Sequence, residues 1–363
     1  MGGGVSVLVG DCREVLPTLA AGSVDAIVTD PPYGLGFMGK DWDRTGVAFD
    51  PATWAAMLPV LKPGGALLAF GGTRTWHRLA CAIEDAGFEI KDCLMWLHGQ
   101  GFPKGKMLLK PAWEPVLLAR KRGAATLNVD RCRIVRTGGD VSGWSRGASR
   151  ASANRSMNGP NYPRPPTSCD KGRWPANVCL DEAAAVLLDA AAGDRGGGFG
   201  VRGGGGAVDG TARTFQGDGQ AVGYGDSGGP SRFFYCAKAS RSEREAGLDG
   251  MPLRPAQNGQ THGNGQATTR MGRTADEGQR PAALAANHHP TVKPVALMRW
   301  LVRLVTPPGG LVLDPFAGSG STGVACALEG MRFVGIEQDG DYAEIARRRV
   351  AHAVGPLLAE ALA

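Results

Sequence analysis

Segments with the pattern of strands alternate with segments that have the spacing of helices at both ends of this chain of 363 residues. The strand-like runs are residues 5–11, 24–33, 66–72, 89–98, 114–121, 311–316 and 331–339. The helix-like segments are residues 13–20, 51–65, 75–88, 289–310, 318–330 and 341–354. Strands that are separated by helix-length segments form βαβ units and pair in parallel. The alternation therefore predicts an α/β fold around a mostly parallel sheet.

This alternation is lost in the middle of the chain. Glycine accounts for 56 of the 363 residues, and glycine-rich runs such as 193–210 and 257–279 have too little apolar surface to offset the entropy cost of ordering. Two islands, residues 172–191 and 231–244, keep the patterns of helices and strands. The predicted division is 1–120, an inserted region with mobile Gly-rich loops at 121–285, and 286–363.

The net charge of +6 also lies in the middle of the chain. Residues 121–290 contain 22 Lys and Arg, of which 19 are Arg, against 15 Asp and Glu, while the rest of the chain has 18 against 19. Guanidinium groups suit phosphates and base edges. This favours contact with nucleic acid, and a solvated Arg-rich coil without such a role remains the alternative.

The cysteines and the hydropathy pattern bear on the class of protein. The eight cysteines contain no C-x-x-C pair, and His288 and His289 lack the spacing of metal ligands, so we expect reduced thiols and no metal site. The sequence has no signal-peptide pattern and no apolar run of about 18 residues. We therefore expect a soluble, cytoplasmic protein without a membrane partner.

A glycine-led turn follows a strand in the sequence LVLDPFAGSGSTGVA. Gly318 and Gly320 allow the backbone to come close to a ligand, and the helix that follows offers free N–H groups. Glu337 ends the next strand 19 residues after Gly318, a distance at which an acid typically binds a ribose hydroxyl. The pattern predicts a nucleoside-binding site but does not choose between nicotinamide, flavin and S-adenosylmethionine.

A second turn, TDPPYG at residues 29–34, ends another strand at the sheet edge where ligands bind in open α/β folds. The lone pair of an exocyclic base amine is delocalised into the ring, and two hydrogen-bond acceptors would localise it. Asp30 offers a carboxylate, and Pro31 a carbonyl on a stiff turn without its own N–H. Tyr33 offers an aromatic face for an extruded base. The turn therefore predicts chemistry on a base amine.

The two motifs together, DPPY and DPFAGSGST, resemble those of the amino methyltransferases of DNA. The catalytic turn precedes the cofactor turn, an order that resembles the circularly permuted β group. Further similar segments are GDCREVLPTLAAGSVDAIV, GFPKG, KPAWEPVLLARK, HPTVKPVALMRWLV and FVGIEQD, while FYCAKASRSER and RWPAN resemble phage-borne or solitary members. The resemblance implies a Rossmann-like S-adenosylmethionine-dependent methyltransferase fold with a seven-stranded sheet and an inserted target-recognition region.

The resemblance also implies the cofactor, S-adenosyl-L-methionine, and the site residues. It assigns catalysis to Asp30, Pro31, Pro32 and Tyr33. It assigns cofactor contacts to Asp11, Cys12, Asp30, Lys293, Asp314, Pro315, Phe316, Gly318, Ser319, Gly320, Ser321, Thr322 and Glu337. Residues 314–322 would hold the methionine end, Glu337 the ribose and Asp11 the adenine. Ser321 replaces a Thr of the commonest pattern, which is a conservative change.

These features predict a site-specific methyltransferase that acts on adenine N6 in duplex DNA by base flipping. Cytosine N4 remains open because both amines need the same acceptors, although Asp at the first motif position accompanies adenine more often in this family. An RNA or protein-glutamine methyltransferase would more naturally carry Asn at position 30. A dehydrogenase would leave DPPY unexplained, and a non-catalytic DNA-binding regulator would not need both motifs. A homodimer, and a cognate restriction nuclease or none, stay open.

Several lone features have plainer interpretations. We expect Arg347, Arg348 and Arg349 to form a solvated face of the last helix. Trp96 and Trp113 are expected in the core or in a pocket wall. The Phe233–Tyr235 segment is predicted as an element of the inserted region, and contact with DNA remains an alternative to packing there.

Overall fold

The computed structural model describes most of the two ends of the chain and the ordered islands of its middle. The described residues are 4–36, 41–99, 109–134, 172–193, 195–196, 200–201, 221–222, 227–237, 242–255 and 284–355. The GFPKG segment and most of the two Gly-rich runs lie outside them. In this part of the chain, no helix is long and apolar enough to cross a membrane.

Nine strands form one sheet in the order β1-β15-β14-β2-β3-β5-β4-β6-β11. Their bounds are β1 (Val5–Val9), β2 (Val24–Thr29), β3 (Leu61–Phe70), β4 (Glu89–Leu97), β5 (Trp113–Arg120), β6 (Val178–Asp181), β11 (Tyr235–Ala237), β14 (Leu311–Asp314) and β15 (Arg332–Glu337). All neighbours pair in parallel except β5, which is antiparallel to both β3 and β4. The predicted α/β class with a mostly parallel sheet is confirmed.

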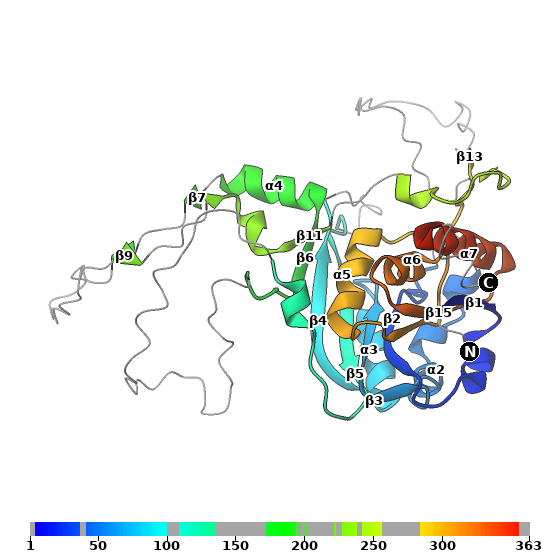
Figure 1. The fold of residues 1–363 in the computed structure, drawn as a ribbon. Helices are drawn as coiled ribbons and strands as arrows, with labels where there is room; N and C mark the ends of the chain where they lie inside the picture. The colour runs from blue at the N-terminus through cyan, green and yellow to red at the C-terminus, as the bar shows by residue number, and fades with distance from the viewer. Residues whose placement is uncertain are drawn as a thin grey trace.

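Within the described residues, seven α-helices flank or follow these strands. They are α1 (Cys12–Val15), α2 (Pro51–Ala55), α3 (Trp76–Asp85), α4 (Glu182–Ala192), α5 (Val295–Val305), α6 (Ser321–Leu328) and α7 (Gly340–Val354). Helices α5, α6 and α7 lie in a row over one face of the sheet, and α4 lies at the sheet end away from the chain termini (Figure 1). Three short antiparallel pairs lie outside the main sheet: β7 (Arg195–Gly196) with β10 (Ser227–Gly228), β8 (Gly200–Val201) with β9 (Ala221–Val222), and β12 (Arg254–Pro255) with β13 (Leu284–Ala285).

Side chains of the central strands alternate between two apolar cores. In β2, Ala26 and Val28 pack with the core of α5, α6 and α7, whereas Ile27 packs with the core of α2 and α3. Leu68 and Leu67 of β3 divide in the same way. A parallel strand that is covered on both faces needs apolar residues at every position, which explains the continuous apolar runs in the sequence.

The sheet has two strands more than the seven implied by the resemblance, and both come from the middle of the chain. β6 pairs with β4 and β11 pairs with β6. The Tyr235 ring of β11 stacks on Trp300 of α5 with centroids 5.2 Å apart, and its hydroxyl donates to the Ala296 carbonyl at 2.8 Å. The ordered islands of the middle region therefore extend the main sheet. Their edge strand β11 is held there because Tyr235 packs against helix α5.

The helix expected over residues 51–65 is shorter than its spacing suggested. Helix α2 ends at Ala55, and β3 already begins at Leu61, where it pairs with Val24. Gly64 has a φ of +76° and its N–H donates to the Lys121 carbonyl at 3.1 Å, so this Pro-Gly-Gly segment turns within the strand. Pro and Gly disfavour a helix, and residues from Leu61 onward pair with the central strand β2 in place of the predicted helix.

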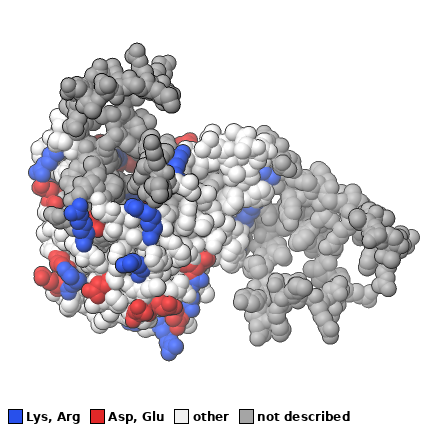
Figure 2. Space-filling view, turned by 180° about the vertical axis from the view of Figure 1, so that it is seen from behind, with Lys and Arg blue, Asp and Glu red and all other residues white. Residues whose placement is uncertain are grey.

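Lys and Arg side chains lie intermingled with Asp and Glu side chains on the face of the molecule that Figure 2 shows. More than half of the Lys and Arg in residues 121–290 fall outside the described residues. The excess positive charge of the middle region is therefore a property of the sequence that the described surface represents only in part.

Candidate active site

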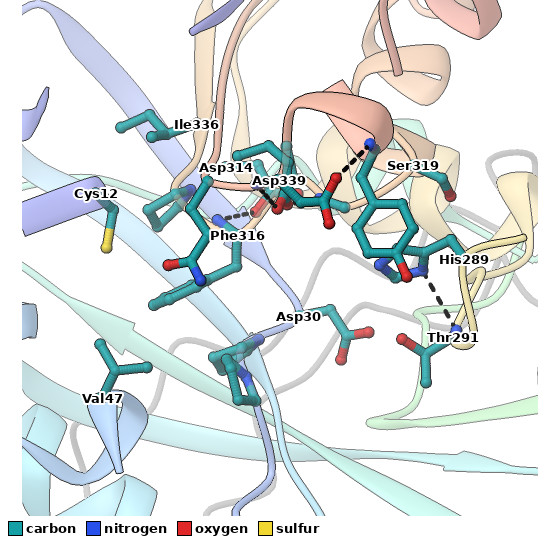
Figure 3. A pocket seen from close by; sticks show the side chains of 18 of the residues that line it. Cys12, Asp30, Val47, His289, Thr291, Asp314, Phe316, Ser319, Ile336 and Asp339 are labelled. Atoms are coloured by element: carbon teal, nitrogen blue, oxygen red, sulfur yellow. Dashed lines mark hydrogen bonds between the residues drawn. The ribbon is translucent and has the colours of Figure 1, made fainter. Parts of the chain in front are cut away.

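A cavity of about 220 Å³ opens at the edge where the parallel strands β1, β2, β14 and β15 end. Every predicted site residue lines this cavity except Gly320. Figure 3 shows Phe316, Val47 and Cys12 along one side and His289 and Thr291 along the opposite side, with Asp30 between them. The fold thus brings together two motifs that lie almost 300 residues apart in the chain.

Asp314 holds the glycine-led turn to its neighbours. Its Oδ1 accepts from Thr29 Oγ1 at 2.6 Å and from the Phe316 N–H at 3.1 Å, and its Oδ2 accepts from Thr322 Oγ1 at 2.6 Å. Burial raises the pKa of Asp314 to about 6, although these hydrogen bonds act in the opposite direction. This carboxyl therefore ties β2, β14 and α6 together at the floor of the cavity.

Gly318 lies where the turn approaches both an acid and a ring. Its N–H donates to Glu337 Oε2 at 2.7 Å, and its φ is +52°. A Cβ at this position would lie 2.8 Å from His289 Nε2, so the close approach requires glycine. Gly320, which does not line the cavity, has a φ of +79° and would place a Cβ 2.8 Å from Ala346 of α7.

Glu337 ends β15 with part of its hydrogen-bonding capacity unused by the described chain. Oε2 accepts from Gly318, and Oε1 accepts from the Asp339 N–H at 2.9 Å. Burial raises the pKa of Glu337, although backbone N–H groups, among them that of Gln338, act in the opposite direction. A carboxylate can accept about four hydrogen bonds, which leaves room for a further donor. A ligand with hydroxyl donors, such as a ribose, would fill these acceptor positions.

His289 is a cavity residue that the sequence reasoning missed, since we expected only that it would not bind a metal. Its ring is edge-on to Tyr342, with centroids 4.6 Å apart, and burial lowers its pKa to about 3. Nδ1 accepts from the Thr291 N–H at 3.3 Å, so the neutral ring carries its hydrogen on Nε2, toward Gly318. Its position four residues before Lys293 was the only signal.

Arg349 corrects the expectation of a solvated Arg347–Arg349 face on α7. Arg349 is only 2% exposed, whereas Arg347 and Arg348 remain partly exposed. Its guanidinium donates to the Ser319 carbonyl, to Ser321 Oγ at 3.4 Å and to the Glu243 carbonyl at 3.2 Å. Helical position placed this residue on the inner face of α7, where it supports the glycine-led turn from behind.

Two side chains of the Asp-Pro-Pro-Tyr turn, Asp30 and Tyr33, belong to a cluster of four polar side chains. Asp30 Oδ2 is 2.9 Å from Lys293 Nζ, and Asp30 Oδ1 is 2.8 Å from the Tyr33 hydroxyl. Glu114 Oε2 is 2.9 Å from the same hydroxyl and 3.1 Å from Lys293 Nζ. The Lys293 ammonium therefore contacts the Asp-Pro-Pro-Tyr turn directly, and Glu114 is a second acid that sequence reasoning did not single out.

The charges of this cluster depend on one another. Burial raises the pKa of Asp30, opposed by Lys293 and assisted by the negative charge of Glu114. Burial also acts to raise the pKa of Glu114, but Lys293 and the Tyr33 hydroxyl outweigh it, and the pKa is lowered. Burial acts to lower the pKa of Lys293, yet the two carboxylates raise it to about 12. Lys293 therefore stays positively charged and forms ion pairs with Asp30 and Glu114.

Asp11 and Cys12 also line the cavity. The Asp11 carboxylate caps α1 through the Arg13 N–H at 2.9 Å, and it also pairs with the Arg13 guanidinium. Cys12 is 5% exposed, and burial raises the pKa of its thiol to about 12, so the thiol is neutral. Among all the residues that the structure describes, no cluster of His, Cys, Asp and Glu has the arrangement of a metal site.

The cavity as a whole is acidic. Of the described residues that line it, six are Asp or Glu and two are Lys or Arg. S-adenosyl-L-methionine carries a sulfonium and an ammonium against one carboxylate, whereas a nicotinamide dinucleotide carries a negative diphosphate. An acidic cavity favours the cation and disfavours the diphosphate. Together with the unused acceptors of Glu337 and the apolar Phe316 wall, the residues present fit S-adenosyl-L-methionine.

Comparison with known proteins assigns a family to this site. The family model N6_N4_Mtase, which describes a DNA methylase, matches residues 24–348. The chain belongs to this family. The match includes both the Asp-Pro-Pro-Tyr turn and the glycine-led turn, and the cofactor of this chain is S-adenosyl-L-methionine, as the resemblance implied.

Curated relatives match the chain over short stretches. The type II methyltransferase M2.DpnII of Streptococcus pneumoniae is 45% identical over 65 residues, which are 18% of this chain and 24% of that protein. The DNA adenine methyltransferase YhdJ of Escherichia coli (strain K12) is 43% identical over 63 residues, 17% of this chain and 21% of that protein. The chain therefore spans about a quarter of the curated relatives that it matches.

A solved structure matches the fold over most of its length. The PvuII DNA methyltransferase, described as cytosine-N4-specific, has a TM-score of 0.50 and 15% identity, and the match covers 95% of this chain and 86% of that one. At this identity the likeness shows the fold alone. It confirms the predicted Rossmann-like fold of S-adenosylmethionine-dependent methyltransferases.

Proposed function

We propose that this protein methylates the exocyclic amine of a flipped base in duplex DNA, with adenine N6 as the preferred target over cytosine N4. The observation that carries the proposal is the position of Asp30. Its carboxylate lines the same cavity as Glu337 and the glycine-led turn, so an acceptor for an amine and a nucleoside site share one space. Membership of the N6/N4 DNA methylase family supports the same reaction.

When bound, S-adenosyl-L-methionine supplies a methyl group on a positively charged sulfur, and transfer forms an N–C bond while the C–S bond breaks. We assign hydrogen-bond acceptance from the amine to Asp30 and to the Pro31 carbonyl, which together localise the nitrogen lone pair. The Tyr33 ring would stack on the flipped base, whose extrusion costs a few kcal/mol. Asp30 also accepts the proton that the amine loses, and its raised pKa makes it a better acceptor than an exposed Asp.

The remaining site residues would bind and orient the cofactor. In this proposal Glu337 binds the ribose, the turn from Asp314 to Thr322 holds the methionine end, and Asp11 and Cys12 lie at the adenine. The neutral His289 adds an Nε2–H donor beside Gly318. Positioning the two reactants supplies a large share of the rate, since effective molarity can account for roughly 7–11 kcal/mol of the barrier.

The choice of adenine rests on resemblance. Asp30 in the DPPY motif and the match to the adenine methyltransferase YhdJ both favour adenine. The fold is shared with a cytosine-N4-specific enzyme, and the same acceptors would serve that amine. Cytosine N4 is therefore the second candidate.

We propose that the inserted region at 121–285 contacts duplex DNA and selects the target sequence. The support is its excess of Arg and its place between the two motif-bearing parts. Two of its strands join the sheet beside β4, so their C-terminal ends lie at the same edge as the cavity. A DNA substrate would place the protein in the cytoplasm of a bacterial or phage-infected cell.

The test incubates the protein with labelled S-adenosyl-L-methionine and unmethylated duplex DNA, digests the DNA, and identifies the methylated nucleoside by mass spectrometry. N6-methyladenine is the expected product. N4-methylcytosine would keep the site and mechanism but reverse the choice of base. A protein that binds the cofactor and DNA but methylates neither base would contradict the proposal and favour a DNA-binding regulator.

A further inference from the structure

Glu114 lies next to the cavity without lining it, and the direction of strand β5 explains its position. β5 runs antiparallel to its neighbours, so its first residues lie at the edge where the parallel strands end. Glu114 does not line the cavity, but its carboxylate contacts two residues that do, Tyr33 and Lys293. Its side chain is 26% exposed, against 17% for Asp30 and 9% for Lys293.

The hydrogens of this cluster can be counted. Lys293 has three N–H donors and three acceptors within reach: Asp30 Oδ2 at 2.9 Å, Glu114 Oε2 at 3.1 Å and the Tyr33 hydroxyl oxygen at 3.1 Å. The Tyr33 hydroxyl has a single hydrogen, yet two carboxylates lie within reach, Asp30 at 2.8 Å and Glu114 at 2.9 Å. The hydroxyl can donate to only one of them at a time.

This choice matters for Asp30. An oxygen that already accepts a hydrogen bond from Tyr33 is a weaker acceptor for a second donor. If the Tyr33 hydrogen turns toward Glu114, Asp30 Oδ1 is left unshared, while Lys293 continues to hold Asp30 Oδ2. The turn requires only rotation about the C–O bond of Tyr33, and no covalent bond changes.

On the basis of the proposed function, we propose that Glu114 is a positioning residue for methyl transfer. It takes the hydrogen of the Tyr33 hydroxyl and so leaves Asp30 Oδ1 as the acceptor for the target amine. Its negative charge, held close by Lys293, also strengthens Asp30 as a proton acceptor. Glu114 itself touches neither the base nor the cofactor.

The electrostatic surroundings agree with this role. The charged groups that act on Asp30 are Lys293 before α5, Glu114 on β5 and Asp314 at the end of β14. Burial raises the pKa of Asp30, Lys293 opposes this, and Glu114 adds to it. Glu114 is in turn acted on by His98 after β4. Removing the Glu114 charge alone is therefore expected to lower the pKa of Asp30.

Two substitutions separate the hydroxyl from the charge. Glu114→Ala removes both the acceptor and the charge, and we expect kcat to fall about tenfold, the order of one hydrogen bond to a charged group, with KM for the cofactor unchanged. Glu114→Gln keeps an acceptor oxygen, so kcat should stay within about threefold of wild type, while the acid limb of the kcat profile moves to lower pH. Glu89→Gln, at the start of β4 and away from the cavity, is the matched control and should change neither.

A double-mutant cycle tests the route through the hydroxyl. In a Tyr33→Phe background there is no hydroxyl to redirect, so Glu114→Ala should lower kcat by clearly less than in the wild type. Equal losses in both backgrounds, or a rise in cofactor KM that accounts for the loss, would overturn the positioning role.

A measurement without DNA separates this inference from the proposed function. The carboxyl carbon of Asp30, labelled with ¹³C and assigned with Asp30→Asn, is titrated by NMR in the wild type and in Glu114→Gln. A lower pKa for Asp30 in Glu114→Gln supports the coupling, and an unchanged pKa refutes it, even for a protein that methylates no base. A wild type that methylates neither base, with the coupling intact, would refute the proposed function alone.

Discussion

Asp314 illustrates how burial changes the behaviour of a single residue in this protein. It is 2% exposed, and burial raises its pKa to about 6 from an ordinary value of 3.8. A carboxyl whose pKa is raised by folding stabilises the folded state at low pH, and this contribution is lost as the pH rises through the folded pKa. Asp314 at the base of the glycine-led turn therefore lowers the free energy of unfolding at neutral pH, where it is ionised, while its carboxylate accepts three hydrogen bonds.

The variant Asp314→Asn tests this at the residue scale. Between pH 7 and pH 5 the folded wild type takes up a proton at Asp314 that the unfolded chain does not, and the variant cannot. We expect the free energy of unfolding of the wild type, relative to the variant, to increase by roughly 1 kcal/mol over this interval. Denaturant unfolding at the two pH values measures it, and an unchanged difference would show that Asp314 does not titrate there.

Asp30 is the residue on which the proposed chemistry depends. We expect Asp30→Ala to lower kcat at least 100-fold, the lower end of what a positioned proton acceptor contributes. Cofactor affinity should fall far less than kcat, because Asp30 is only one of the predicted cofactor contacts and the glycine-led turn and Glu337 remain. Asp85→Asn, at the exposed end of α3, is the control. Turnover near the wild-type value in Asp30→Ala, measured by methyl transfer to DNA, would end the proposed mechanism.

At the scale of elements, the turn between β14 and α6 depends on one close approach. Gly318→Ala would meet both the strain of a φ of +52° and the contact with His289, so we expect cofactor affinity to fall roughly tenfold. Gly340→Ala, at the start of α7 with open space around it, should have no such effect. In a His289→Ala background the steric part of the Gly318→Ala loss should disappear, which calorimetric binding of the cofactor would show. An equal loss in both backgrounds would exclude the steric cause.

Helix α7 supports the same turn from its buried face. Arg349→Met removes the donors to the Ser319 carbonyl and Ser321 Oγ, and we expect the cofactor Kd to rise about tenfold. Arg348→Met, one position along the helix and paired with Glu344 at the surface, should leave the Kd unchanged. The same Kd for both variants would mean that the turn does not need Arg349.

At the scale of the whole molecule, the excess of cations in residues 121–290 predicts how DNA binding responds to salt. If these side chains neutralise phosphates, log K should fall linearly with log salt concentration, with a slope of about −0.9 for each phosphate contact. Cofactor affinity should vary far less, because all the described residues that line the cavity except His289 come from the other parts of the chain. Fluorescence anisotropy with a labelled duplex measures the slope, and a flat affinity would contradict phosphate contact by this region.

Much of the fold follows from local patterns. The strands at residues 24–29, 89–97 and 311–314 were predicted because continuous or alternating apolar residues have few other solutions. The two motif turns were predicted because Gly, Pro and Asp specify backbone geometry over a few residues. The prediction of a helix over residues 51–65 was wrong in extent. The apolar residues there have helical spacing, but Leu61 pairs with Val24 in the sheet instead.

The sequence by itself determined the α/β class, the two turns, the acids at their strand ends and the family to which they belong. Only the tertiary structure brought Glu114, His289 and Arg349 next to the site residues, since each contacts a partner far away in the chain. It also joined β6 and β11 to the main sheet. The physical reason is that the burial and the pKa of a side chain depend on which other side chains it contacts. Strand direction and helix packing determine these contacts, and no local sequence pattern encodes them.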